Sequence, residues 1–236
     1  MRQLTYGIYD DREPQWSPDG KRILFSSDRN NNYDIWEMDL ATESFKALTS
    51  NPKNEFNPSY APDGKTISYV SDRGAKPTVY VRSDEGVEKE LAVGHATTAS
   101  PSWSPDGKQI IYYTSNGVEP RLYQVDVATG KIMDFTDPKE DAFPFRATWL
   151  SLTEVLYTAD GQIKKKDMVK KKTTAIAWEA IVYLHRPSYM RKKYDFDSQT
   201  AKPVKGIMAP VVSPDGKKIV FAALGNIWML NIGNPV

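Results

Sequence analysis

The stretch Ser17-Pro18-Asp19-Gly20 occurs four times in this chain in nearly the same form. The other copies are Ala61-Pro62-Asp63-Gly64, Ser104-Pro105-Asp106-Gly107 and Ser213-Pro214-Asp215-Gly216. Each copy follows an aromatic or apolar residue, and each is followed by a lysine and an apolar run. Because a motif that returns at a regular interval marks a repeated supersecondary unit, the sequence predicts an array of similar units and not one irregular core.

The residues that precede the turns define the length of the unit. Four of them are Trp16, Tyr60, Trp103 and Val212. Trp149 occupies the same place in a unit where residues 150–153 have lost the turn motif. The intervals agree with the roughly 40–50 residues of a four-stranded propeller blade, except that the last one is longer. We therefore predict five units, the fourth of which carries an insertion.

Apolar and polar residues alternate within each unit, which is typical of strands. In the first unit this pattern covers residues 14–17, 22–26, 34–39 and 45–49. Between the first two strands, Pro18 favours a type I turn and Gly20 supplies a left-handed residue. The sequence therefore predicts an all-β fold.

The fifth unit ends before a fourth strand, and residues 2–5 resemble the end of a last strand such as 47–49. We expect residues 2–5 to join the last blade and close a five-unit β-propeller, because closure covers exposed strand edges. The alternative is a fragment of a larger ring, open or closed by another copy of the chain. The expected single domain covers residues 1–236, with units at 14–49, 58–93, 101–136, 147–206 with the insertion, and 210–232 plus 2–5.

Composition and missing motifs exclude several function classes. The 31 Lys and Arg against 30 Asp and Glu give a net charge of +1, which favours neither nucleic acid nor a membrane surface. No apolar run approaches the roughly 20 residues that span a bilayer, no signal-peptide pattern is present, and the absence of cysteine excludes disulfides and thiolate metal sites. Nucleophile-elbow, phosphate-loop and dinucleotide motifs are also missing. We therefore predict no catalytic residue, no cofactor and no metal site.

Two groups of candidate residues have structural explanations. His95 and His185 are read as loop histidines without a role. Asp28-Arg29 and Asp72-Arg73 recur at the end of the second strand, and we expect these aspartates to accept backbone N–H bonds in the following turn.

The fourth unit contains the most basic stretch of the chain. Its positive charge suits an anionic partner, either an acidic protein surface or an anionic envelope component. The tyrosines among these charges would also suit nucleic acid, but the near-zero net charge of the chain argues against that partner. The alternative is a lysine-rich edge that blocks strand-to-strand aggregation. We expect the contact surface within residues 177–206 and the neighbouring hairpin. The candidate partner-binding residues are Lys164, Lys165, Lys166, Arg186, Tyr189, Arg191, Lys192 and Lys193.

The repeat resembles that of TolB-type propellers. The resemblance rests on Trp-Ser-Pro-Asp-Gly-Lys at 16–21 and 103–108, Ser-Asp-Arg at 27–29 and 71–73, Asp-Ile-Trp at 34–36 and the Leu-Thr ending at 48–49. It implies a periplasmic or secreted protein that binds a protein of the cell envelope. Residues 160–232 also resemble the propeller part of bacterial secreted amidohydrolases, but this chain lacks the His-x-His pair and the barrel of those enzymes.

These observations predict a non-catalytic propeller module that binds a protein or a ligand. The first alternative is the propeller segment of a larger amidohydrolase-like enzyme. The second is a stand-alone propeller lyase or glycosidase with a site in the channel. We also expect a homo-oligomer if the ring does not close alone.

Overall fold

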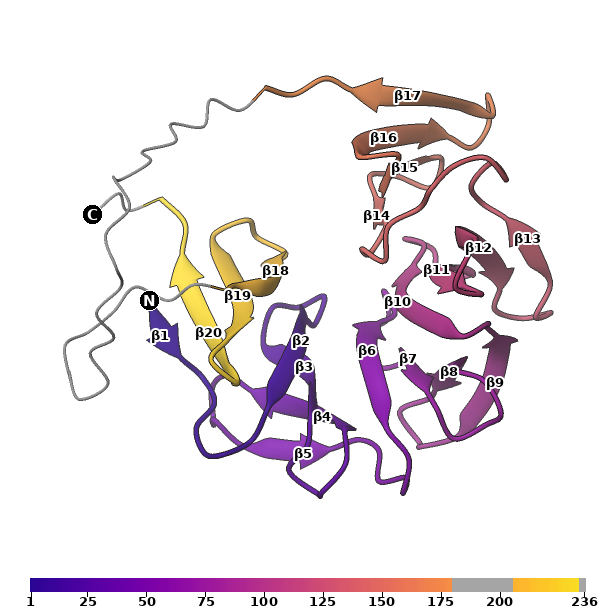
Figure 1. Cartoon of the computed structure of the whole chain (residues 1–236). Helices are drawn as coiled ribbons and strands as arrows, with labels where there is room; N and C mark the ends of the chain where they lie inside the picture. Colours follow the sequence, from indigo (N-terminus) through magenta and orange to yellow (C-terminus); the bar gives the residue numbers. More distant parts are fainter. Residues whose placement is uncertain (180–205, 234–236) are drawn as a thin grey trace, which may run out of the picture.

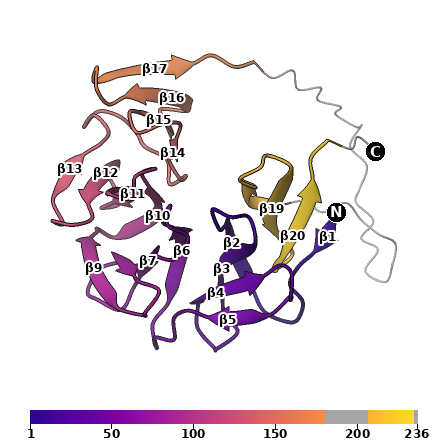
Figure 2. The ribbon, with the colours of Figure 1, turned by 180° about the vertical axis from the view of Figure 1, so that it is seen from behind.

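The computed structural model describes residues 1–179 and 206–233, and this part of the chain forms five antiparallel four-stranded sheets in a ring (Figure 1). The predicted all-β, five-bladed propeller is confirmed. The view from behind shows the same order of blades around the ring (Figure 2). Among the described residues there is no helix long and apolar enough to cross a membrane.

Each blade consists of four strands in sequence order, apart from the last. Blade one contains β2 (Asp11–Trp16), β3 (Arg22–Ser27), β4 (Asp34–Asp39) and β5 (Phe45–Ala47). Blade two contains β6 (Glu55–Tyr60), β7 (Ile67–Ser71), β8 (Thr78–Arg82) and β9 (Glu88–Val93). Blade three contains β10 (Thr97–Trp103), β11 (Gln109–Ser115), β12 (Pro120–Asp126) and β13 (Ile132–Asp134). Blade four contains β14 (Thr148–Trp149), β15 (Glu154–Ala159), β16 (Gln162–Asp167) and β17 (Lys172–Ile176).

Blade five is completed by the N-terminus, as the sequence predicts. It contains β18 (Met208–Val212), β19 (Lys218–Ala223), β20 (Asn226–Asn231) and the outer strand β1 (Arg2–Gln3). The Leu4 amide donates to the Ile227 carbonyl at 2.7 Å, and the Ile227 amide donates to the Thr5 hydroxyl at 2.8 Å. Residues 2–5 therefore supply the outer edge of the last blade.

The repeated turn is held by its own serine and aspartate. In blade one the Ser17 hydroxyl donates to Asp19 at 2.5 Å, and Ser17 Oγ accepts the Arg22 amide at 2.9 Å. Gly20 adopts a φ of 68°, which a residue with a Cβ enters only at a cost. Ser104 and Ser213 make the same bonds in blades three and five. The motif is therefore a folding device that fixes the hairpin between the first two strands of a blade.

Apolar side chains fill the spaces between four pairs of neighbouring blades, and no buried cluster of the described residues joins blades four and five. Four buried clusters join blades five and one, one and two, two and three, and three and four. The aromatic residue before each turn leans onto the preceding blade. Trp16 Nε1 donates to the Val211 carbonyl at 3.2 Å, and Trp149 Nε1 donates to the Ser102 carbonyl at 3.3 Å. Residues 180–205, which link blades four and five and contain most of the expected insertion, lie outside the described residues.

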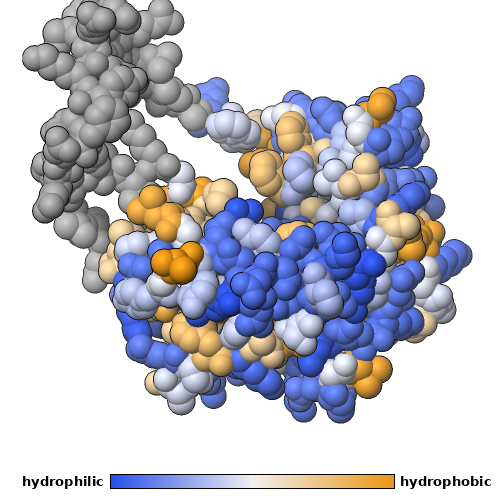
Figure 3. All heavy atoms as spheres, turned by 60° about the horizontal axis from the view of Figure 1, so that its bottom comes forward, coloured by the Kyte–Doolittle hydropathy of each residue, from blue (hydrophilic) through white to orange (hydrophobic). Residues whose placement is uncertain are grey.

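The outer surface is mostly polar. Figure 3 shows one side of the molecule, where hydrophilic residues predominate and apolar ones are scattered. This distribution agrees with a core that lies between the blades, because the outer strands, such as β5, β13 and β17, are largely exposed and do not need to be apolar.

Blades one and two share a buried acidic pair. Asp34 and Glu55 are 1% and 0% exposed, and each has a carboxylate oxygen without a hydrogen-bond partner among the described residues. In blade one, Arg29 lies 2.8 Å from the equivalent Asp11, but in blade two Arg73 lies 3.9 Å from Glu55 and pairs with Glu88. Burial raises the pKa of Asp34 and raises that of Glu55 to about 7.

Replacing the turn glycine in Gly107→Ala is expected to lower the free energy of unfolding by about 1 kcal/mol, because an L-residue is strained at a φ of 70°. The added Cβ would have room, since its nearest neighbour is 3.7 Å away, so the cost comes from the backbone alone. Urea denaturation measures the change. The control is Gly74→Ala, where the glycine does not have a positive φ. Equal stabilities for both variants would contradict the role given to the turn.

The raised pKa of Glu55 predicts that its contribution to the free energy of unfolding falls as the pH rises from about 4.5 to 7. The folded protein keeps the Glu55 proton up to about pH 7, whereas the unfolded chain loses it near 4.5. The contribution of Glu55 to the free energy of unfolding is therefore fully present below pH 4.5 and is lost as the pH rises through 7. Between these two pH values the free energy of unfolding falls by about 1.4 kcal/mol per pH unit. Glu55→Gln is expected to flatten this slope in urea denaturation at several pH values. Glu119→Gln, an exposed control, is expected to leave the slope unchanged, and a slope of the same size in Glu55→Gln would refute the assignment.

Candidate functional site

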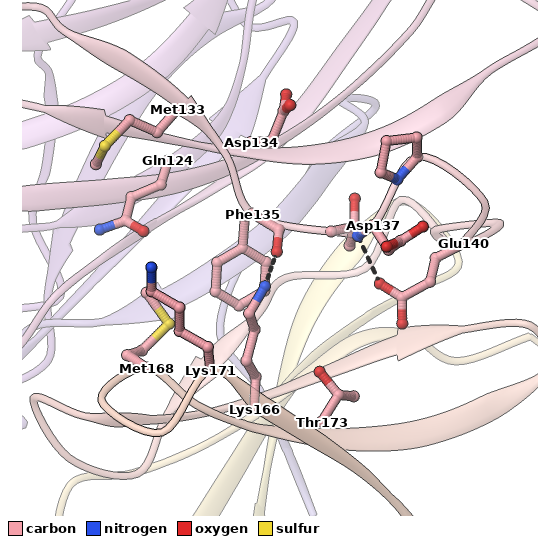
Figure 4. A pocket seen from close by; sticks show the side chains of 12 residues that line it. Gln124, Met133, Asp134, Phe135, Asp137, Glu140, Lys166, Met168, Lys171 and Thr173 are labelled. Atoms are coloured by element: carbon pink, nitrogen blue, oxygen red, sulfur yellow. Dashed lines mark hydrogen bonds between the residues drawn. The ribbon is translucent and has the colours of Figure 1, made fainter.

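A groove opens between blades three and four (Figure 4). It has a volume of about 740 Å³ and lies between the end of blade three and the β16–β17 hairpin of blade four. Its walls combine apolar, acidic and basic side chains, so a bound molecule could make both apolar contacts and ion pairs there. The lining residues are Gln124, Met133, Asp134, Phe135, Thr136, Asp137, Pro138, Glu140, Lys166, Met168, Lys171 and Thr173.

Lys166 and Phe135 form the centre of the groove. The Lys166 ammonium donates to the Phe135 carbonyl and lies 4.6 Å from the centroid of the Phe135 ring. The ring is 1% exposed and packs edge-to-face on Tyr157 at a centroid distance of 5.3 Å. Burial lowers the pKa of Lys166, because few charges compensate its ammonium there. The Lys166 ammonium, held by the Phe135 carbonyl and ring, is therefore the positive charge at the centre of the groove.

Glu140 organises the acidic side of the groove. Its carboxylate accepts bonds from Lys164 at 2.8 Å, from the Tyr157 hydroxyl at 3.0 Å and from the Asp137 amide at 2.9 Å. Lys164 also pairs with Asp160, and these two carboxylates raise its pKa. The positive charge of Lys164 is thus compensated within the protein.

The consecutive lysines of β16 do not form one basic surface. Side chains alternate along a strand, and Lys165 pairs with Glu154 at 2.8 Å, away from the groove. The structure brings Lys164 and Lys166 beside Glu140 and Phe135, and it separates Lys165 from them. The remaining candidates lie outside the described residues, together with His185: Arg186, Tyr189, Arg191, Lys192 and Lys193.

The other residues singled out from the sequence have structural partners. Asp28 accepts the Asp10 amide and Asp72 accepts the Asn54 amide, both at 2.8 Å. These donors come just before the first strand of the same blade and not from the following turn, so the aspartates tie the start of the first strand to the end of the second. His95 is exposed, and its amide donates to the Thr114 hydroxyl at 2.8 Å.

Sequence reasoning missed a second polar group, at the axis of the ring. The first strands of four blades each contain a bulge with a left-handed residue that precedes a proline. Arg146 stands at the corresponding place in blade four, before Ala147. The sequence does show the pattern of these bulges: in four blades a proline lies two residues before the residue that precedes the turn. The bulge residues and their prolines are Glu13-Pro14, Asn57-Pro58, Ser100-Pro101 and Ala209-Pro210.

Residues 1–179 and 206–233 contain no group of three or more histidine or acidic side chains that could hold a metal ion.

Residues 7–177 match the family described as the TolB beta propeller domain. No curated protein matches the sequence. Among solved structures, TolB from Acinetobacter baumannii is similar with a TM-score of 0.63 and 20% identity, over 96% of this chain and 55% of that one. A putative TolB from Agrobacterium tumefaciens has a TM-score of 0.62 and 16% identity, over 97% of this chain and 79% of that one.

An oligogalacturonate lyase from Vibrio parahaemolyticus is similar with a TM-score of 0.56 and 12% identity, over 98% of this chain and 93% of that one. At these identities the structural likenesses establish the fold alone, and the chain spans only 55% of the length of the Acinetobacter protein. The family match, in contrast, covers well over half of this chain. The chain belongs to the TolB β-propeller family.

Proposed function

We propose that the chain is a non-catalytic binding module, periplasmic or secreted, whose groove between blades three and four holds a segment of a partner protein. The observation that carries this proposal is a groove of about 740 Å³ whose walls combine apolar side chains, such as Met133 and Met168, with charged side chains of both signs. Protein interfaces combine apolar contacts with polar and charged groups in this way.

The side chains of the groove suit a protein segment better than a purely anionic polymer. Met133 is 41% exposed, and methionine adapts its shape to a bound partner. Asp134, Asp137 and Glu140 add negative charge beside Lys166 and Lys171. Since both signs of charge are present, a partner with apolar residues and flanking charges is the best match.

The lysines of the β16–β17 hairpin also suit a protein partner that carries charged residues. Glu140, Asp160 and Glu154 compensate Lys164 and Lys165. Lys171 lines the groove and makes no ion pair among the described residues. An acidic residue of the partner would therefore pair with Lys171, while the remaining predicted residues of 186–193 extend the contact.

Family membership supports the proposed location in the periplasm or outside the cell. Members of this family include proteins named TolB, and the first two structural likenesses carry that name. A rigid ring that presents loops and grooves is well suited to holding another protein.

A photo-crosslinking residue in place of Met133 is expected to capture one discrete protein from a cell-envelope extract of the source organism. The matched control is Ile132, which neighbours Met133 on β13, is 43% exposed and does not line the groove. Equal capture from both positions, or none from position 133, would contradict the proposal.

Charge reversal in Lys171→Glu is expected to weaken that capture, and to do so more at low than at high ionic strength, because salt screens exposed charges. Lys170→Glu is the control, since the Lys170 side chain is 77% exposed and lies outside the groove. The same loss in both variants would show that the effect is one of overall charge and not of the groove.

A further inference from the structure

The propeller axis carries one distinct residue from each blade, and four of them are polar. The first strands β2, β6, β10, β14 and β18 lie nearest the centre of the ring (Figures 1 and 2). The corresponding positions on or just before these strands, called here the axial ring, are Glu13, Asn57, Ser100, Arg146 and Ala209. The turns repeat from blade to blade, but these five positions all differ.

Hydrogen bonds link the axial ring from one blade to the next. Glu13 accepts the Asn57 amide at 2.5 Å and also the Asn57 side-chain amide. Asn57 Oδ1 accepts the Ser100 amide at 3.2 Å. The Ser100 hydroxyl donates to the Pro144 carbonyl at 2.9 Å, in the segment that leads to blade four. These bonds connect the axial positions from blade one to the segment that precedes blade four.

Arg146 is the cation of this ring. Its guanidinium donates to the Pro101 carbonyl at 2.5 Å and to the Pro58 carbonyl at 3.0 Å, so it reaches across blades three and two. No carboxylate of the described residues forms an ion pair with it. Burial lowers the pKa of Arg146 to about 10, and the charge of Glu13 opposes this effect. The group therefore stays charged at neutral pH and has no direct counter-ion among residues 1–179 and 206–233.

Part of the guanidinium remains available for a ligand. A guanidinium has five N–H donors, and the two carbonyls occupy only two of them. Arg146 is half-buried, and its two bonds to carbonyls use the terminal nitrogens, which leaves the Nε–H without a bond to any other described residue. A planar fork with free donors matches the two oxygens of a carboxylate. Because an uncompensated buried charge is costly, an anionic ligand would relieve it.

We propose that the axial ring binds the carboxylate group of a small organic acid, with Arg146 as its anchor and Asn57 and Ser100 beside it. The negative charge of Glu13 disfavours anions that carry two charges, so the ligand is a monocarboxylate. This site is separate from the groove between blades three and four and does not depend on the proposed function.

The probe is propionate, titrated into the full chain at constant ionic strength, with the neutral propionamide as control. The signal of the Arg146 Nε–H in ¹H–¹⁵N spectra, assigned by its loss in Arg146→Lys, is expected to shift to saturation with propionate and not with propionamide. A signal that does not move in the folded wild-type protein would overturn the proposal.

Two variants test the anchor by calorimetric titration with propionate. Arg146→Gln is expected to weaken binding about tenfold or more, as expected for loss of a charged hydrogen-bonded pair. Arg82→Gln removes a half-buried arginine outside the axial ring and is expected to leave the affinity unchanged. Equal affinities in Arg146→Gln and Arg82→Gln would refute the site.

The Glu13→Gln variant changes affinity in the opposite direction and does not remove the anchor. It keeps the shape of the side chain but takes away the negative charge near the ligand, so propionate is expected to bind a few-fold more tightly. Unchanged or weaker binding in this variant would contradict the charge arrangement inferred for the ring, even if Arg146→Gln fails to fold.

Discussion

A four-stranded blade has two broad faces and cannot shield both of them alone, so each blade in this protein depends on its neighbours. The aromatic residue before each turn meets this requirement. Trp16, Tyr60 and Trp103 are each 8% exposed, and each packs in a cluster that contains side chains of the preceding blade. Because this contact recurs at the same place in successive units, the aromatic residue and the turn after it are repeated together in the sequence.

The repeat also explains where variation is tolerated. Where the turn keeps serine, proline, aspartate and glycine, in blades one, three and five, its hydrogen bonds fix the hairpin. The axial positions need only a residue that accepts the bulge, and so they differ in charge and size from blade to blade. Chemistry that distinguishes this propeller from others is therefore found at the axis and between blades, while the strands themselves carry the common scaffold.

Features that depend on neighbouring residues in the sequence were predictable. The turns follow from Pro-Asp-Gly, and the N-terminal strand follows from its likeness to residues 47–49. The site residues were harder, because their partners are distant in sequence. In the sequence Lys164 belongs to a run of lysines, and only the fold brings Glu140 to it. The residues next to Arg146 in the sequence likewise do not indicate its bond to the Pro58 carbonyl. The bulge prolines were visible as a pattern, but only the fold shows that they surround one axis.

The outer strand of blade five comes from the opposite end of the chain, and this has a consequence for synthesis. The amide of Ile227 bonds to the hydroxyl of Thr5, 222 residues away. On the ribosome, the first residues must wait with their strand edge unmatched until β20 has emerged, while blades one to three can already assemble. The pairing of β1 with β20 therefore forms only after nearly all of the described strands have been synthesised.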